Sequence, residues 1–181
     1  MSVFQAELDI ATINFNKTLE VECQKLFAAT NYTIATAETI SGGIVGNTLK
    51  SITAKNNNYI ASIVCDHPQA FKKFFALQVD SNTIFSESMT IAMAKGVAQT
   101  LGTNIGLSCT GAIGYPDEQK VSSAKIMLGF YFNHNEVVKT LNLMGTKQVV
   151  LQQVLQAALA YLKNYFVKFS NINESKEAIN E

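Results

Sequence analysis

Residues Tyr32–Leu49 carry the pattern that most restricts the fold: a short apolar run, a polar turn with two glycines, and a helix-like repeat. The run Tyr32–Thr36 is rich in β-branched residues, which is typical of a strand. Segment Ile44–Leu49 places apolar residues at helical spacing and predicts a helix from about Ser41 to Lys50. Where a strand passes through such a turn into a helix, side chains and backbone N–H groups gather at one edge of the sheet. Open α/β proteins usually bind ligands at that edge, so the turn is a candidate site.

The rest of the chain continues this alternation and predicts a single three-layer α/β/α domain. Further helices are expected over residues 14–29, 69–77, 86–102 and from 146 onward, and further strands over Tyr59–Cys65, Ile105–Cys109, 124–132 and 136–143. The last two strands form an antiparallel hairpin in a mixed, mainly parallel sheet. We place the domain at residues 14–168, after an N-terminal extension (1–13) and before a polar tail (169–181).

Composition excludes several partners. The chain has 181 residues with 14 cations and 14 anions, so its formal net charge is zero. Without a basic field, nucleic acid and anionic membranes are not expected partners. All the cations are lysine, so no arginine fork can bind a phosphate, and lysines, hydroxyls and backbone N–H groups would have to serve.

The titratable residues also restrict the chemistry. Cys23, Cys65 and Cys109 are odd in number and widely spaced, which gives neither a disulfide framework nor a zinc-binding pattern. His67 and His134 are isolated, so we expect no metal and no cofactor. The chain shows no signal-peptide pattern and no apolar run of membrane-spanning length, which together with the cysteines predicts a cytoplasmic protein.

A second glycine-bearing segment, Thr110–Pro116, follows the predicted strand Ile105–Cys109. If this strand lies beside the first one, the two turns face one cleft, in which backbone N–H groups can hold a phosphate. Neither turn matches G-x-G-x-x-G or a P-loop, so glycines that only permit tight turns remain the alternative. The expected ligand-binding residues are Glu38, Gly42, Gly43, Thr110, Gly111 and Gly114.

A hydroxyl nucleophile in the first turn, at Thr39 or Ser41, would need a base to take its proton. With no usable histidine, lysine is the natural candidate. Lys72 and Lys73 follow the second predicted strand and could border the same cleft. The alternative for both is an exposed helix face.

Five segments occur in a characteristic order within about residues 15–162: Ala37–Gly43, Val64–Val79, Phe85–Glu87, Thr110–Gly114 and Met144–Lys147. In this order they resemble the motifs A-E-S-C-T-G-G, T-Y-S-N-x-x-K with its L-G-V ending, V-S-E, T-G-I-A-G and P-G-D-R. These are the motifs of the CinA C-terminal domain family, whose stand-alone members include nicotinamide mononucleotide deamidases.

This resemblance implies the fold and a site that hydrolyses nicotinamide mononucleotide to nicotinate mononucleotide and ammonia. The family's nucleophilic serine falls on Thr39, with Ser41 as the next hydroxyl. Its lysine aligns best with Lys73, although an insertion leaves Lys72 open. Lys147 replaces the arginine of P-G-D-R and joins the ligand-binding residues. The resemblance also implies a homo-oligomer, with a dimer favoured, and a small nucleotide ligand.

Two departures from the family pattern bear on activity. Threonine adds a methyl group beside the attacking oxygen, and Val64–Pro68 contains no counterpart of the family's active-site tyrosine. We therefore expect little or no deamidation. The alternative function is that of a non-catalytic paralogue that binds a nucleotide or regulates a partner.

Overall fold

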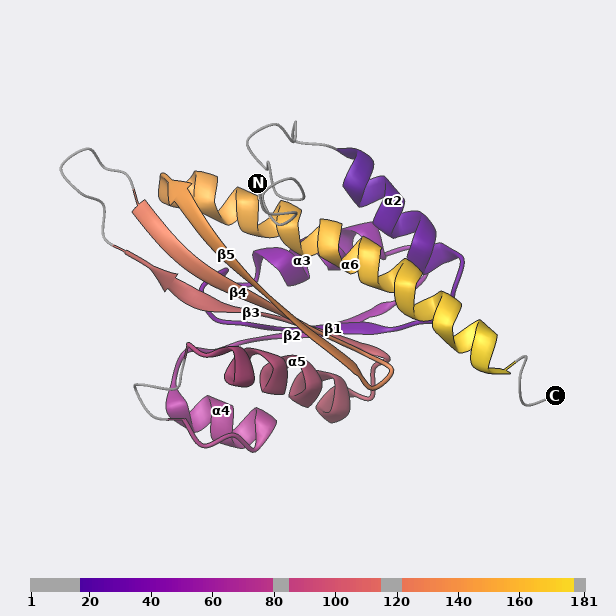
Figure 1. The fold of residues 1–181 in the computed structure, drawn as a ribbon, viewed down its shortest axis with the longest axis horizontal. Coiled ribbons are helices and arrows are strands. Elements are labelled where there is room, and N and C mark those ends of the chain that lie inside the picture. Colours follow the sequence, from indigo (N-terminus) through magenta and orange to yellow (C-terminus); the bar gives the residue numbers. More distant parts are fainter. Residues whose placement is uncertain (1–16, 80–84, 115–121, 178–181) are drawn as a thin grey trace.

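The computed structural model describes residues 17–79, 85–114 and 122–177, and they form a five-stranded sheet between two helical layers (Figure 1). The strands are β1 (Ile34–Glu38), β2 (Tyr59–Val64), β3 (Ile105–Ile113), β4 (Ser122–Phe132) and β5 (Asn135–Gly145). The helices are α2 (Lys17–Ala28), α3 (Ile44–Ile52), α4 (Pro68–Phe75), α5 (Glu87–Leu101) and α6 (Lys147–Glu177). The predicted α/β/α architecture is confirmed.

The sheet has a parallel half and an antiparallel half. Its strand order is β2-β1-β3-β4-β5, with β1 parallel to both β2 and β3. Strands β3, β4 and β5 pair antiparallel. The carboxyl ends of β1, β2 and β3 therefore meet at one edge of the sheet, where the predicted site lies.

The predicted hairpin is present, with a tighter loop than expected. Asn133 and His134 alone connect β4 to β5, and both have positive φ, at 44° and 72°. Two left-handed residues give the loop the twist of a type I′ turn, which suits asparagine. Asn135, expected in the loop, begins β5.

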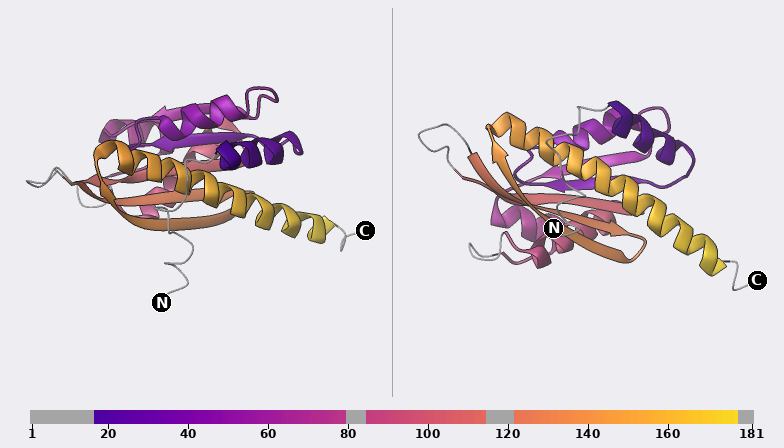
Figure 2. Two further views of the ribbon diagram at one scale, coloured as in Figure 1. Left: turned by 90° about the horizontal axis from the view of Figure 1, so that it is seen from above. Right: turned by 45° about the horizontal axis from the view of Figure 1, so that its top comes forward.

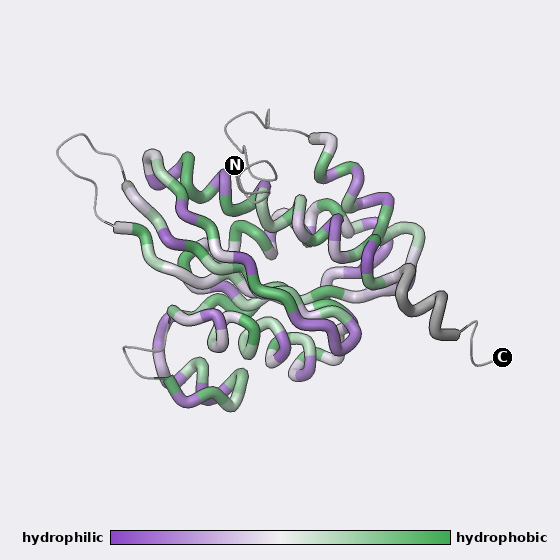
Figure 3. Tube along the Cα trace, viewed as in Figure 1, coloured by the Kyte–Doolittle hydropathy of each residue, from purple (hydrophilic) through white to green (hydrophobic). Residues whose placement is uncertain are grey.

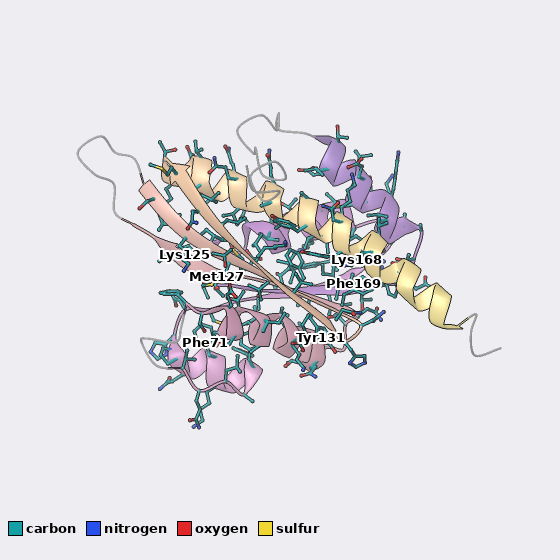
Figure 4. All side chains as sticks on the ribbon, viewed as in Figure 1. Phe71, Lys125, Met127, Tyr131, Lys168 and Phe169 are labelled. Atoms are coloured by element: carbon teal, nitrogen blue, oxygen red, sulfur yellow. The ribbon has the colours of Figure 1, made fainter. Side chains whose placement is uncertain are left out.

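Two apolar layers enclose the sheet. Helices α2, α3 and α6 cover one face, with α3 over the parallel half and α6 over the antiparallel half (Figure 2). Helices α4 and α5 cover the other face. Phe71 of α4 and Phe169 of α6 are buried on opposite sides of the sheet (Figure 4). Apolar and polar residues alternate along the helices, as expected for elements with one buried side (Figure 3).

Helix boundaries follow the sequence signals at α5 and reveal an unexpected cap at α4. Ser86 accepts a hydrogen bond from the Met89 N–H, and Gly102 ends α5 with φ 64°, as predicted. His67, which the sequence left without a role, accepts the Gln69 N–H through Nδ1 at 3.2 Å. This histidine is therefore the N-cap of α4.

Several boundaries differ from prediction, three of them by three residues or more or in the type of structure. Strand β3 continues to Ile113, so Thr110–Ile113 belongs to the ladder with β4 and is not a turn. Helix α3 begins at Ile44, three residues later than expected, because Thr39–Gly43 forms the connection. Helix α6 continues to Glu177, through the first residues of the expected polar tail. The predicted extension 1–13 lies outside the described residues.

Candidate functional site

The candidate site is the turn Thr39–Gly43, at the carboxyl end of β1. Glu38 pairs with Val64 on one side and with Cys109 on the other. The Thr39 N–H donates to the Cys109 carbonyl at 2.9 Å, and the Cys65 N–H donates to the Glu38 carbonyl at 2.9 Å. Thr39 and Cys65 thus lie next to each other at the ends of neighbouring strands.

Beneath the turn, the side chain of Glu38 is completely buried against α3. Its Oε2 accepts the Ser41 hydroxyl at 2.6 Å and the Val45 N–H at 3.2 Å. Its Oε1 accepts the Gly46 N–H at 2.7 Å. Two further hydroxyls lie within hydrogen-bond distance of Oε1, those of Thr36 at 3.0 Å and Ser62 at 3.3 Å. A buried carboxylate with this many donors holds the surrounding groups in place, and we call Glu38 with its hydrogen-bond donors the anchor.

Glu38 changes what helix α3 can offer a ligand. The sequence predicted free N–H groups at the start of this helix for a phosphate or an oxyanion. Instead, the N–H groups of Val45 and Gly46 point at the Glu38 carboxylate, which lies where a bound anion would. Glu38 itself was expected to contact a ligand, but its carboxylate faces inward and can reach one only through its electric field.

Gly46 and Tyr59 complete this cluster, and the sequence patterns indicated a role in the site for neither of them. A Cβ on Gly46 would lie 2.6 Å from the Tyr59 oxygen and 2.7 Å from Thr36 Oγ1. The glycine therefore lets α3 approach the sheet closely enough to reach Glu38. The Tyr59 hydroxyl hydrogen bonds with Thr36 and Ser62, and burial raises its pKa. Only a hydroxyl in the middle of an apolar strand, at Ser62, hinted at this cluster.

The two hydroxyls of the turn have different roles. Ser41 is only 5% exposed, and its hydroxyl donates a hydrogen bond to the Glu38 carboxylate. Thr39 is half-buried, and its Oγ1 makes one long hydrogen bond, at 3.4 Å, to the Cys109 carbonyl. Thr39 is therefore the hydroxyl of this turn that a ligand can reach, while Ser41 is part of the anchor.

Two cysteines flank the turn, and neither is an activated nucleophile. Burial raises the pKa of Cys109 to about 12, against hydrogen bonding from Ser41 that lowers it. Burial and then the charge of Asp66 raise the pKa of Cys65. Both thiols therefore stay protonated at neutral pH, and the thiolate is the reactive form.

The glycines of the turn provide its left-handed backbone. Gly42 has φ 62° and is exposed, with no atom within 4 Å of the place where a Cβ would stand. Gly43 has φ 91°, and a Cβ there would lie 3.2 Å from Val64 Cγ2. Since non-glycine residues rarely adopt these angles, the two glycines make the turn possible and leave its surface uncovered.

The second predicted segment lies beside the first but has a structural role in its inner part. Thr110 is completely buried, and its Oγ1 lies 2.6 Å from Thr90 Oγ1 on α5. The Thr90 hydroxyl donates to the Ser86 carbonyl, so Thr110 must be the donor to Thr90. A Cβ on Gly111 would lie 2.3 Å from the Lys125 carbonyl of β4, so this glycine serves strand packing. Ala112 and Gly114, in the outer part of the segment, are exposed.

The candidate lysines are on the surface. Lys72 and Lys73 lie on the exposed side of α4, opposite the buried Phe71. Lys73 Nζ is 5.8 Å from the centre of the Phe74 ring. Lys147, at the first position of α6, is exposed as well. The burial that would hold a lysine neutral as a general base is therefore not present at Lys73.

A groove of about 620 Å³ runs from the turn along α3 and the edge strand β2. Its lining includes Gly43, Asn47, Lys50, Asn57, Tyr59 and Val64. Tyr59 and Ser62, which both line the groove, belong to the cluster around Glu38. The groove therefore lies next to the residues that support the turn.

Within the described ranges, no three His, Cys, Asp or Glu side chains gather as metal ligands would. Across the same part of the chain, no helix combines the length and apolar character needed to cross a membrane.

Comparison with known proteins gives a consistent picture. The family model of the CinA C-terminal domain matches residues 16–166. A CinA-like protein of Kosmotoga olearia is 28% identical over 151 residues, which cover 81% of this chain and 37% of that protein. The chain spans less than two fifths of the length of the curated relatives it matches first.

Solved structures show the same fold. A competence-damaged protein (CinA) superfamily protein of Klebsiella pneumoniae 700603 superposes with a TM-score of 0.69 at 18% identity, over 83% of this chain and 96% of that one. A CinA superfamily protein of Escherichia coli gives a TM-score of 0.69 at 20% identity, over 86% and 91% of the two chains. At these identities the likeness establishes the fold.

Proposed function

Because this chain belongs to the CinA C-terminal domain family, we propose that it binds a nicotinamide nucleotide with the carboxamide at the Thr39–Gly43 turn. The observation that carries this proposal is that the two hydroxyls of the turn have different roles. Ser41 is committed to Glu38, whereas the Thr39 hydroxyl remains within reach of a ligand. The exposed Gly42 leaves room for that ligand beside it.

The reaction at this turn would be amide hydrolysis through an ester. The Thr39 oxygen attacks the carboxamide carbon as its proton passes to a base, for which Lys73 is our candidate. The base then gives this proton to the nitrogen of the tetrahedral intermediate, the C–N bond breaks, and ammonia leaves while an acyl-threonine ester remains. Water hydrolyses this ester to the nucleotide acid and regenerates Thr39. Lys147 is our candidate for contact with the phosphate.

Three features of the site support slow turnover. The Thr39 methyl group stiffens χ1 and crowds the attacking oxygen. Cys65 stands beside Thr39, where the resemblance places a tyrosine, and its raised pKa keeps the thiol protonated. Lys73 is exposed, so it lacks the burial that would favour a neutral lysine as a base.

The second candidate function is binding without hydrolysis. It is favoured by the pattern of change, because the anchor around Glu38 is fully hydrogen-bonded while the groups needed for proton transfer are altered. A domain of this kind would bind the nucleotide and change its interaction with a partner protein when the nucleotide is bound.

We also propose that the protein is a cytoplasmic homodimer. Light scattering at micromolar concentration should then give a mass above that of a ~20 kDa monomer, since a standard interface of ~800 Å² per partner persists at that concentration.

Ammonia release from nicotinamide mononucleotide separates the two functions. We expect slow or no release by the wild type and measurable release by Thr39→Ser, which removes the extra methyl group. Adding Lys73→Ala to Thr39→Ser should abolish release, and adding Lys72→Ala is the matched control. Wild-type turnover that survives Thr39→Ala would show that Thr39 is not the nucleophile. No release by either protein, with saturable nucleotide binding, would establish the binding function.

A further inference from the structure

Two carboxylates lie close to the Thr39 end of the sheet. Glu38 directly precedes Thr39 and is completely buried. Asp66 follows Cys65, the residue that pairs with the end of β1 through the Glu38 carbonyl. The nearest charges along both strand ends are therefore negative.

The neighbouring groups respond to these charges. Burial is the main cause of the raised pKa values of Cys65, Cys109 and Tyr59, and a carboxylate raises each pKa further. That carboxylate is Asp66 for Cys65 and Glu38 for the other two. Tyr59 belongs to β2 and Cys109 to β3, on either side of β1, and Cys65 directly follows β2. Negative charge therefore acts on groups on both sides of β1.

Helix α3 offsets only part of this charge. Its N-terminus carries about half an elementary positive charge, and Glu38 carries a full negative one. The donors around Glu38 are hydroxyls and N–H groups, which hold the carboxylate in place without neutralising it. Lys73 and Lys147, the cations proposed for this site, are exposed, so solvent and salt screen their charges more strongly than the charge of the buried Glu38. A ligand group at the turn therefore meets mainly the negative field of Glu38.

We infer that Glu38 makes the Thr39–Gly43 turn selective for a neutral carboxamide over the corresponding carboxylate. The inference rests on the proposed function, because it concerns which end of the nucleotide enters the turn. An amide and its acid have nearly the same shape, so steric fit cannot separate them. The acid brings a second negative charge beside Glu38, and a like charge within several ångströms is costly at a protein's effective dielectric.

This selectivity has two consequences for the ligand. The turn favours the amide form and repels the acid that deamidation produces, so the acid dissociates readily. The ligand phosphate, which is also anionic, lies away from the first turn of α3. Glu38 thus acts through its field on the bound group and through Ser41 on the shape of the turn.

Calorimetric titration of the wild-type chain with nicotinamide mononucleotide and with nicotinate mononucleotide tests the inference. We expect the amide to bind about tenfold more tightly than the acid, which corresponds to about 1.4 kcal/mol. Equal or tighter binding of the acid would overturn the inference and leave the proposed function standing. Failure of both nucleotides to bind would overturn the proposed function and this inference with it.

The variant Glu38→Gln tests whether Glu38 causes the preference for the amide, because glutamine keeps the shape of the side chain and removes its charge. The amide-to-acid ratio should fall to about two- or threefold, while Ser41→Ala, which removes a donor and leaves the charge, should keep it near tenfold. A tenfold ratio that persists in folded Glu38→Gln would overturn the role of Glu38. If circular dichroism shows that Glu38→Gln is unfolded, the amide-to-acid ratio of the wild type tests the inference. A smaller fall of this ratio in Asp66→Asn is then expected as well.

Discussion

The turn Thr39–Gly43 and the segment Thr110–Gly114 look alike in the sequence, since each combines at least one hydroxyl residue with two glycines after an apolar run. In the structure they lie side by side but do different work. The first is a true turn whose glycines have positive φ and whose surface is open at Gly42. The second is mostly strand, and Gly111 is needed because β4 passes too close for a side chain.

The hydroxyls of the two segments differ in the same way. Thr39 is half-buried and weakly hydrogen-bonded, whereas Thr110 is buried and joins β3 to Thr90 of α5. A glycine or hydroxyl at a strand end therefore marks either a ligand-binding turn or a packing constraint. Free space and hydrogen-bond partners distinguish these two cases, whereas a positive φ does not, since Gly111 has one as well.

The largest effect is expected for Gly111→Ala. The new Cβ would lie 2.3 Å from the Lys125 carbonyl and 2.9 Å from Ile126 Cα, both backbone atoms that can move only with β4. We expect a loss of about 4 kcal/mol in the free energy of unfolding, measured by urea denaturation. A loss below about 1 kcal/mol would mean that the strand packing does not require this glycine.

Glu38→Ala should follow closely in size. It would leave the Val45 and Gly46 N–H groups and the Ser41 hydroxyl buried without their acceptor. We expect a loss of about 3 kcal/mol in the same denaturation experiment. Asp66→Ala, which removes an exposed carboxylate, is the control and should change stability by less than about 0.5 kcal/mol. Equal small effects would contradict the structural role of Glu38.

Thr110→Val should have a moderate effect on stability and none on ligand binding. The substitution keeps the shape and removes the hydrogen bond to Thr90, which retains its own bond to the Ser86 carbonyl. We expect a loss of about 1 kcal/mol in stability and an unchanged Kd for nicotinamide mononucleotide. A large increase in Kd would return Thr110 to the ligand-binding residues.

The smallest effect on stability is expected for Gly42→Ala. A Cβ there meets no other atom, so the cost comes from the left-handed backbone alone. We expect about 1 kcal/mol or less, together with weaker nucleotide binding because the methyl group occupies open space in the turn. Binding that stays unchanged in calorimetry would show that the ligand does not approach Gly42.

The sequence was a good guide where local patterns decide the structure. Strand β2, helix α5 with its caps at Ser86 and Gly102, and the β4–β5 hairpin follow from apolar spacing and turn residues. The family resemblance also identified the fold. These features depend on residues close in the chain, which a single sequence displays directly.

The contacts around the candidate site could not be predicted from local patterns because they join residues far apart in the chain. Nothing around Glu38 indicates that its carboxylate turns inward to α3, since this depends on the close approach at Gly46 and on hydroxyls from β2. The continuation of β3 through Gly111 depends on pairing with β4. The exposure of Lys73 was the alternative that helical spacing left open, and Phe71 on the buried side of α4 decides it.

The most direct test of the contrast between the two segments is a titration of the ¹⁵N-labelled chain with nicotinamide mononucleotide, followed by amide NMR signals. The account predicts saturable shifts at Thr39, Gly42 and Gly43, smaller shifts at Gly111, and none at Gly106, at the opposite end of β3. Shifts confined to the groove around Lys50 and Asn57, or the absence of any shift at the turn, would contradict it.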